Sequence, residues 1–366
     1  MKAFLSPPCL NCEAERVALA AALDSGYIAP CGPMVDAFEA RAKERFGFSH
    51  ALATNSGTMA LELLARALNI QPGDEIIAST LTFIASVAPF VSLGAMPVFV
   101  DADATSWCMD VALAEKALRE HPKAKALIVT DLYGQSCDID ALAALCAQYN
   151  VKFIVDAAES VGATYQQRAS GKGAWATIYS FNGNKIITTG GGGLLLSDDG
   201  ALVALCQQLA SQGREPTLWY EHQRVGTHGR MGNIPAAIGL AQLEHLEDAL
   251  CDKQRVWEEW HQALEGLPID FMPIASYGMP NFWLTVITLP PSVDPIEMTK
   301  IFLQAGFEAR PMWKPMHLQP VFKSAPVYLN GQSERLFKRG LCLPSGRKLT
   351  RALMDEMVCL LKEALV

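Results

Sequence analysis

The feature that most constrains the fold of this chain is an alternation of two hydrophobic periods between residues 50 and 200. Seven short runs rich in aliphatic and β-branched residues alternate with segments that carry the 3.6-residue apolar repeat of a helix. The strand-like runs are ALAT, EIIAST, MPVFV, KALIVTD, VKFIVD, TIYSF and GLLLS. Such alternation indicates βα units, so we predict an α/β fold with one mostly parallel, seven-stranded sheet covered by helices on both faces.

Later segments predict how the chain is divided. Residues 233–263 are rich in Ala, Leu, Glu and Gln and predict one or two long helices at a hinge. Beyond them FWLTVITL predicts a strand, the run after Pro295 predicts a helix, and a Pro- and Trp-rich stretch ends in LCLPSG. We therefore expect a large domain over residues 1–250, with an N-terminal arm, and a smaller C-terminal α+β domain over residues 251–366.

Charge, hydropathy and cysteine content narrow the class of protein. A net charge of -8 without any Lys/Arg run argues against a nucleic-acid partner. No apolar run approaches the roughly 20 residues that span a bilayer, and MKAFLSPPCL lacks the regions of a signal peptide, so we expect a cytoplasmic protein without a membrane partner. Ten scattered cysteines are expected to be reduced. Cys9 and Cys12 have CxxC spacing but lack a second cysteine or histidine pair, so no metal site is expected.

The most informative stretch is DAAESVGATY followed by SFNGNKIITTGGGG, in which each part suits a pyridoxal phosphate site. A protonated pyridine ring needs a carboxylate beside its nitrogen, and Asp156 ends the apolar strand FIV where it could serve. Alternatively, Asp156 caps a following helix. The cofactor aldehyde needs an amine that is neutral near neutral pH, and Lys185 lies in a crowded, Gly-rich turn that would lower its pKa. A solvated surface charge is the alternative for Lys185.

An earlier stretch, ATNSGTMALELL, ends a strand and opens a helix at Ser56, Gly57 and Thr58. The free amides at such a helix start can bind an anion such as the cofactor phosphate, although ordinary capping explains the same residues. Ser180 could add a phosphate contact. Phe83 could stack on the pyridine ring, although a Phe of the core is the commoner case.

Together these motifs resemble the DegT/StrS family of sugar aminotransferases, which are fold-type I pyridoxal phosphate enzymes related in architecture to aspartate aminotransferase. The landmarks are SGTMAL, TFIAS, PVFVD, LYGQSCDID, DAAESVGA, SFNGNKIITTGGGG and AAIGLAQLE, in the family's order. The resemblance implies that Lys185 is the Schiff-base lysine and proton shuttle and that Asp156 partners the pyridinium. It also implies that Gly57, Thr58 and Ser180 bind phosphate, that Phe83 stacks, and that Glu159 lies by the cofactor where the family usually has Gln or His.

Within the family, FLSPP, YIAP, RPMWKPMHLQPVF and LCLPSG resemble the branch that acts on UDP-4-keto-6-deoxy-N-acetylglucosamine. The resemblance implies transfer of an amino group from glutamate to C4 of that sugar. Alternatives are another keto-sugar nucleotide, of legionaminic or perosamine type, or a non-catalytic regulator on the same scaffold. A sugar dehydratase of this fold would carry His in place of Lys185.

The family also implies a homodimer with shared active sites. Its GYNYR motif, whose Asn reaches the partner's cofactor phosphate, reads GTHGR here, so His228 occupies that position. An imidazole can donate to a phosphate, and more strongly when charged. Candidates for holding the sugar nucleotide, each with domain-interface packing as the alternative, are Tyr27, Arg310, Trp313 and His317.

Overall fold

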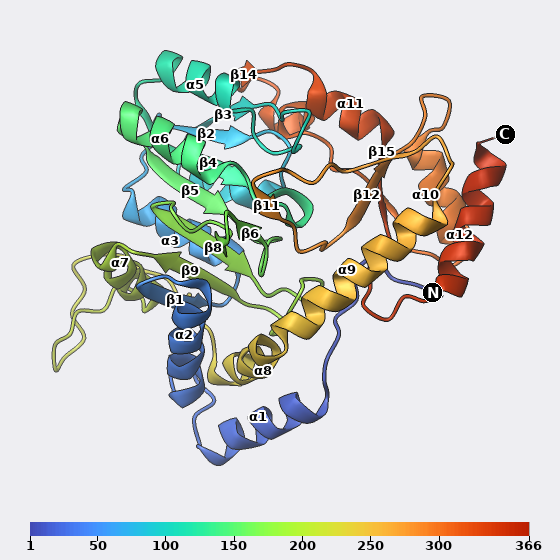
Figure 1. Ribbon diagram of the computed structural model, residues 1–366. Helices are drawn as coiled ribbons and strands as arrows, with labels where there is room; N and C mark the ends of the chain where they lie inside the picture. The colour runs from blue at the N-terminus through green and yellow to red at the C-terminus, as the bar shows by residue number, and fades with distance from the viewer. Residues whose placement is uncertain (366) are drawn as a thin grey trace.

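The computed structural model describes residues 1–365, and its largest element is an eight-stranded sheet (Figure 1). The strand order is β1 (His50–Thr54), β9 (Gly193–Ser197), β8 (Ala176–Ser180), β5 (Lys152–Asp156), β4 (Ala124–Thr130), β2 (Glu75–Ser79), β3 (Met96–Val100) and β14 (Val327–Tyr328). Only β9 pairs in the antiparallel sense, with both of its neighbours. All seven predicted strands are present, and the α/β class is confirmed. The eighth strand was not predicted, because β14 is only two residues long and comes from the C-terminal part of the chain.

Helices cover both faces of this sheet, as predicted. One face packs against α3 (Gly57–Ala67), α4 (Ala88–Ser92) and α7 (Gly200–Ala210). The other packs against α2 (Pro33–Phe46), α5 (Val111–Glu120), α6 (Ile139–Tyr149) and α8 (Asn233–Glu244). Alternate strand residues face opposite layers: Ile76 and Ala78 belong to the first core, and Ile77 belongs to the second. The result is a three-layer sandwich in which the central strands are buried on both sides.

A second sheet has its own hydrophobic core. It is antiparallel, with the order β10 (Asp270–Phe271), β12 (Thr285–Thr288), β15 (Gly340–Leu343) and β13 (Arg310–Pro311). Buried side chains of α9 (Leu246–Ala263), α10 (Pro295–Gln304) and α12 (Arg351–Ala364) complete this core. The first residues of the chain join it through a bridge between Ala3 and Phe307, and Figure 1 shows the chain then running away to α1 (Glu13–Asp24), which packs on α8.

The remaining elements are short. A three-stranded sheet is formed by β6 (Thr164–Tyr165), β7 (Arg168–Ala169) and β11 (Gly278–Met279). Single helical turns are η1 (Ile84–Ser86), η2 (Leu132–Gly134), η3 (Met316–Leu318) and η4 (Pro320–Phe322), and α11 (Gln332–Arg339) precedes β15. The predicted hinge helices are α8 and α9, which are separated at His245. Among residues 1–365, no helix combines the length and the apolar character needed to cross a bilayer.

The parallel strands determine where functional side chains gather. Because they run in one direction, their carboxyl ends meet at one edge of the sheet, which is where ligands bind in open α/β folds. At this edge Asp156 ends β5, Thr130 ends β4 and Ser180 ends β8. The first turn of α3 begins there as well, directly after β1. Residues far apart in the sequence therefore converge at this edge.

Candidate active site

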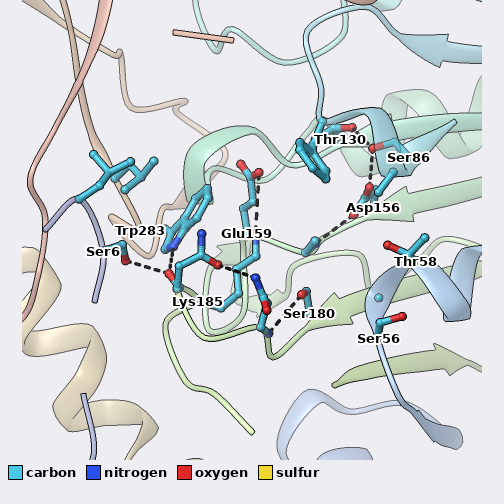
Figure 2. Close-up of a pocket in the computed structure, with 18 of the residues that line it drawn as sticks. Ser6, Ser56, Thr58, Ser86, Thr130, Asp156, Glu159, Ser180, Lys185 and Trp283 are labelled. Atoms are coloured by element: carbon cyan, nitrogen blue, oxygen red, sulfur yellow. Dashed lines mark hydrogen bonds and ion pairs between the residues drawn. The ribbon is translucent and has the colours of Figure 1, made fainter. Parts of the chain in front are cut away.

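A cavity of about 710 Å³ opens at the carboxyl edge of the large sheet (Figure 2). Its walls come from the N-terminal arm, from the loops after the parallel strands, and from the segment around β12 and β13. Of the twelve site residues expected from the sequence, nine line this cavity: Gly57, Thr58, Phe83, Asp156, Glu159, Ser180, Lys185, Arg310 and Trp313. The size of the cavity suits a cofactor together with a substrate.

Asp156 lies at the inner wall of the cavity and is only 5% exposed. The Ser86 hydroxyl donates to its Oδ2 at 2.5 Å, and the Ala158 amide donates to Oδ1 at 3.1 Å. Burial raises the pKa of the Asp156 carboxyl, and these two donors oppose the shift. A turn follows Asp156, so it does not cap a helix. The arrangement suits a carboxylate that faces a cationic ligand.

Lys185 reaches the cavity from the turn after β8, where its amide donates to the Asn182 carbonyl at 3.0 Å. Its Nζ lies 4.0 Å from Glu159 Oε1 and 4.0 Å from the centroid of the Trp283 ring. Burial lowers the pKa of the Lys185 amine, and the carboxylates of Glu159 and Asp156 oppose that shift. This lysine is therefore not a solvated surface charge, and its amine is shifted toward the neutral, nucleophilic form.

Glu159 is a second buried carboxyl in the cavity, 4% exposed. Its Oε2 accepts a hydrogen bond of 2.6 Å from the Tyr133 amide. Tyr133 holds a left-handed backbone conformation with φ of 52°, which costs a non-glycine residue about 1–3 kcal/mol and aims its amide at this carboxyl. Burial raises the pKa of Glu159, and Lys185 opposes the rise. Lys185 and Glu159 therefore share an ion pair whose proton distribution depends on what fills the cavity.

The start of α3 forms the opposite wall. Ser56 caps the helix, with its Oγ accepting from the Met59 amide at 3.0 Å, as ordinary capping predicts. Gly57 and Thr58 nevertheless face the cavity beside Ser180. A methyl group on Gly193 of β9 would lie 2.4 Å from the Gly57 nitrogen, so β9 packs directly against this helix start. The exposed amides and the helix dipole make this wall a site for an anion.

Aromatic and charged side chains form the outer part of the cavity. Phe83 is 58% exposed, so it is not a core residue, and its ring centroid lies 5.8 Å from that of Trp313. The Arg310 guanidinium donates to Glu308 Oε1 at 2.9 Å. Glu308 Oε2 in turn accepts the Leu5 amide at 3.1 Å, which ties the N-terminal arm to this wall. A planar group and an anionic group could both be held here.

Three expected residues lie outside this cavity. His317 is buried: its Nδ1 is 2.6 Å from Thr80 Oγ1, and its other ring nitrogen is 3.4 Å from Glu334. Its ring is thus held between β2 and α11, where packing turns it away from the cavity. Tyr27 is 54% exposed between α1 and α2. His228 is exposed on the loop before α8, so neither Tyr27 nor His228 contributes to the site within its own chain.

Sequence reasoning missed several residues that line the cavity. Ser86 of η1 donates to Asp156, and Thr130 at the end of β4 contacts Ser86 in turn, so only the tertiary structure brings the three residues together. Trp283 was interpreted only as part of a strand. Ser6 lies in the N-terminal arm, whose SPP sequence gave no sign of a contact with the Lys185 turn. Asn184 could have been noticed, because it directly precedes Lys185 in the Gly-rich motif.

The chain is similar to known proteins over almost its whole length. The model of the DegT/DnrJ/EryC1/StrS aminotransferase family matches residues 11–362. EpsN of Bacillus subtilis strain 168, named as a pyridoxal phosphate-dependent aminotransferase, is 40% identical over 358 residues, which is 95% of this chain and 92% of EpsN. GDP-perosamine synthase of Caulobacter vibrioides is 36% identical over 356 residues, covering 96% and 95% of the two chains. The solved structure of Spr1654 from Streptococcus pneumoniae, described as a sugar aminotransferase in its PLP form, superposes with a TM-score of 0.90 at 25% identity and covers 99% of each chain.

Proposed function

Because the chain belongs to the DegT/DnrJ/EryC1/StrS aminotransferase family, and is therefore a pyridoxal phosphate-dependent sugar aminotransferase, we propose that Lys185 is its catalytic lysine. The enzyme transfers the amino group of glutamate to the keto carbon of a nucleotide-linked sugar. The observation that carries the residue assignment is that the Lys185 amine, whose side chain is 13% exposed, and the buried Asp156 carboxyl line one cavity. A helix start suited to a phosphate completes that cavity.

The residues present fit pyridoxal phosphate. Gly57, Thr58 and Ser180 would hold its phosphate at the start of α3, and Asp156 would keep its ring nitrogen protonated. The ring would stack on Phe83, which is exposed toward the cavity, with Glu159 close to its edge. When bound, the cofactor carries the amino group between the two substrates and draws electron density away from the substrate carbon.

Lys185 performs two tasks in this proposal. Its Nζ would hold the cofactor, for which the neutral amine favoured by burial is needed. The same Nζ would move a proton at the substrate carbon as general acid and base. Glu159, which lies 4.0 Å from that nitrogen, holds or releases a proton as the charge on Lys185 changes.

For the acceptor we propose UDP-4-keto-6-deoxy-N-acetylglucosamine, aminated at C4. The support is that the segment RPMWKPMHLQPVF resembles the family branch that acts on this sugar. Two residues of the segment, Arg310 and Trp313, line the cavity. Arg310 suits the diphosphate and Trp313 suits a flat ring. A GDP-linked 4-keto sugar is the second candidate, because a relative at 36% identity is a GDP-perosamine synthase.

Product analysis tests the reaction and the acceptor together. Purified enzyme is incubated with pyridoxal phosphate, glutamate and a panel of UDP-, GDP- and dTDP-linked 4-keto sugars, and the amino-sugar products are identified by mass. We expect amination of the UDP-linked N-acetyl sugar to have the highest kcat/KM. A higher kcat/KM for the GDP-linked sugar selects the second candidate. An absence of product with every sugar would overturn the proposed function.

We also propose a homodimer in which His228 of each subunit reaches the partner's cofactor. The supporting observation is that the loop before His228 exposes large apolar side chains, including Trp219 at 64%, Tyr220 at 80% and Val225 at 85% exposure. Such a patch is rarely left in contact with water and suits a second copy of the chain. A monomer on light scattering would contradict this proposal.

Mixing two defective subunits tests whether His228 acts in the partner's site. A Lys185→Ala subunit and a His228→Ala subunit together form one intact site in the mixed dimer, because Lys185 of one chain meets His228 of the other. We expect activity to reappear on co-expression. Activity that stays at the level of the separate variants would show that His228 acts within its own chain or not at all.

We propose a cytoplasmic location on the basis of the cysteines. All ten lie within the described residues and are unpaired. Burial raises the pKa of buried thiols, as for Cys146, whose pKa rises to about 12, so they stay protonated and unreactive. Unpaired cysteines in this number are typical of a reducing compartment.

A further inference from the structure

Lys253 of α9 is a buried lysine that has no part in the proposed chemistry. Its residue is 3% exposed, and its Nζ contacts three oxygen atoms: Ser6 Oγ at 3.1 Å, the Trp283 carbonyl at 2.9 Å and the Ser345 carbonyl at 2.7 Å. None of these acceptors carries a charge. Burial lowers the pKa of the Lys253 amine to about 7, but the three acceptors match the three N–H donors of its ammonium form. Burying an ammonium group costs several kcal/mol, so a site that supplies three matched acceptors must be well ordered.

The three acceptors belong to separate parts of the chain that meet around the Lys185 turn. Ser6 lies in the N-terminal arm, Trp283 precedes β12, and Ser345 follows β15. Ser345 is also tied to the arm, because its amide donates to the Leu5 carbonyl at 2.7 Å. One ammonium group therefore fastens the arm to one end of the second sheet, where β12 begins and its neighbour β15 ends.

Two hydrogen bonds connect Ser6 and Trp283 to Asn184, the residue before Lys185. The Ser6 hydroxyl accepts from Lys253 and donates to the Asn184 carbonyl at 2.8 Å. The Trp283 indole donates to the same Asn184 carbonyl at 2.7 Å, while its ring lies 4.0 Å from Lys185 Nζ. Figure 2 shows Ser6 and Trp283 on the same side of Lys185. The two donors to the Asn184 carbonyl, the Ser6 hydroxyl and the Trp283 indole, therefore belong to residues that Lys253 contacts.

We propose that Lys253 is a positioning residue for Lys185. It orders Ser6 and Trp283, which together fix the Asn184 carbonyl and hold the indole ring against the Lys185 amine. Lys253 is not among the residues that line the cavity, so it acts only through these contacts. The inference rests on the proposed function of Lys185, and it names the contacts that keep the Lys185 amine buried and in place.

Loss of the Lys253 contacts should change the pKa of Lys185 in a direction that can be measured. Burial is the largest cause of the lowered pKa of Lys185, so a loosened arm that admits water should return that pKa toward its ordinary value. A reacting group displaced by about 1 Å can lose on the order of 100-fold in rate. The Lys253 variant should therefore raise the apparent pKa of Lys185 and lower kcat more than it raises KM.

The test compares two variants that break the network with one control. Lys253→Met removes the ammonium group at similar volume. Ser6→Ala removes the relay to Asn184 and one of the three acceptors of Lys253, while leaving the ammonium group in place. Lys300→Met is the matched control, because Lys300 is exposed and pairs only with Glu297 on its own helix. For each protein we would measure amide exchange of residues 2–6 without cofactor, the pH dependence of the rate of pyridoxal phosphate incorporation, and kcat and KM.

In Lys253→Met we expect the amides of the arm to exchange faster and the apparent pKa of Lys185 to rise. Its kcat should be about 10- to 100-fold lower. Ser6→Ala should produce smaller changes in the same direction, and Lys300→Met none. If Lys253→Met merely lowers the melting temperature and both variants keep the wild-type pKa and kcat, the positioning role is overturned. Borohydride labelling of the wild-type enzyme separates the two proposals: an unlabelled Lys185 overturns the proposed function, whereas a labelled Lys185 with unchanged variants overturns only the role of Lys253.

Discussion

Glu159→Gln is the most direct test of the electrostatics of the site. The substitution removes the carboxylate charge next to Lys185 but keeps the side-chain shape and an oxygen that can accept the Tyr133 amide. In the cofactor-free enzyme, the anionic form of Glu159 favours the ammonium form of Lys185 and so raises its pKa. Removing that charge leaves burial less opposed, and the pKa of Lys185 should fall.

The size of the change follows from the distance. Two unit charges 4.0 Å apart interact by about 4 kcal/mol at an effective dielectric constant of about 20, which is equivalent to about 3 pKa units. Burial raises the pKa of Glu159 to about 8, so the carboxyl is ionised during only part of the titration and the full interaction is an upper bound. We expect the apparent pKa of Lys185 to fall, because the charge that opposes the effect of burial is removed.

The assay follows the visible absorption that develops when pyridoxal phosphate is added to cofactor-free enzyme, at a series of pH values. The initial rate reports the fraction of neutral Lys185 amine. Glu39→Gln is the control, because Glu39 is a partly buried carboxyl with a raised pKa that accepts a backbone amide, from Ala53 at 2.8 Å, but it lies outside the cavity. An apparent pKa of Lys185 that is unchanged or raised in Glu159→Gln would refute the reasoning.

Three further predictions concern the catalytic lysine and the two walls of the cavity. Lys185→Ala should purify as a folded protein and give no amino-sugar by mass spectrometry; substantial turnover would contradict its assigned role. Ser86→Ala removes a donor from the buried Asp156 carboxylate and should weaken cofactor binding by about 1–3 kcal/mol, measured as the dissociation constant by fluorescence quenching, and an unaltered constant would show that the Ser86 bond is dispensable. Gly193→Ala places a methyl group 2.4 Å from the Gly57 nitrogen, so it should displace the start of α3 and lower cofactor affinity at least 10-fold; wild-type affinity would show that α3 does not hold the phosphate.

Much of the fold could be predicted because its signals are local. Strand and helix periods lie within ten or so neighbouring residues, so all seven predicted strands of the large sheet and the helices α3, α5 and α6 between them follow from pattern alone. Asp156 stands out in the sequence as a charged residue at the end of an apolar strand, and Lys185 stands out as a lysine in a Gly-rich turn. The strand β14 was missed because two residues carry no detectable period, and only pairing with β3 makes them a strand.

The exposure of side chains near the site could not be predicted in the same way. Aromatic and histidine side chains occur both in binding sites and in packing, so nothing in the sequence separates His317, which lies beside Thr80, from Trp313, which lines the cavity. Likewise, Tyr27 does not line the cavity of its own chain, although the motif that contains it resembles that of the family branch. The direction of a side chain depends on the packing of its whole element against the rest of the chain.

The sequence by itself therefore determined the order of the elements, the fold class and the likeness to a family, together with the charged residues that end strands. Only the tertiary structure decided which distant groups share a hydrogen bond. Ser86 meets Asp156 across 70 residues, and Lys253 meets Ser6 across 247. The physical reason is that local propensity acts between neighbours in the chain, whereas such contacts form only when the sheets and helices pack and exclude water around them.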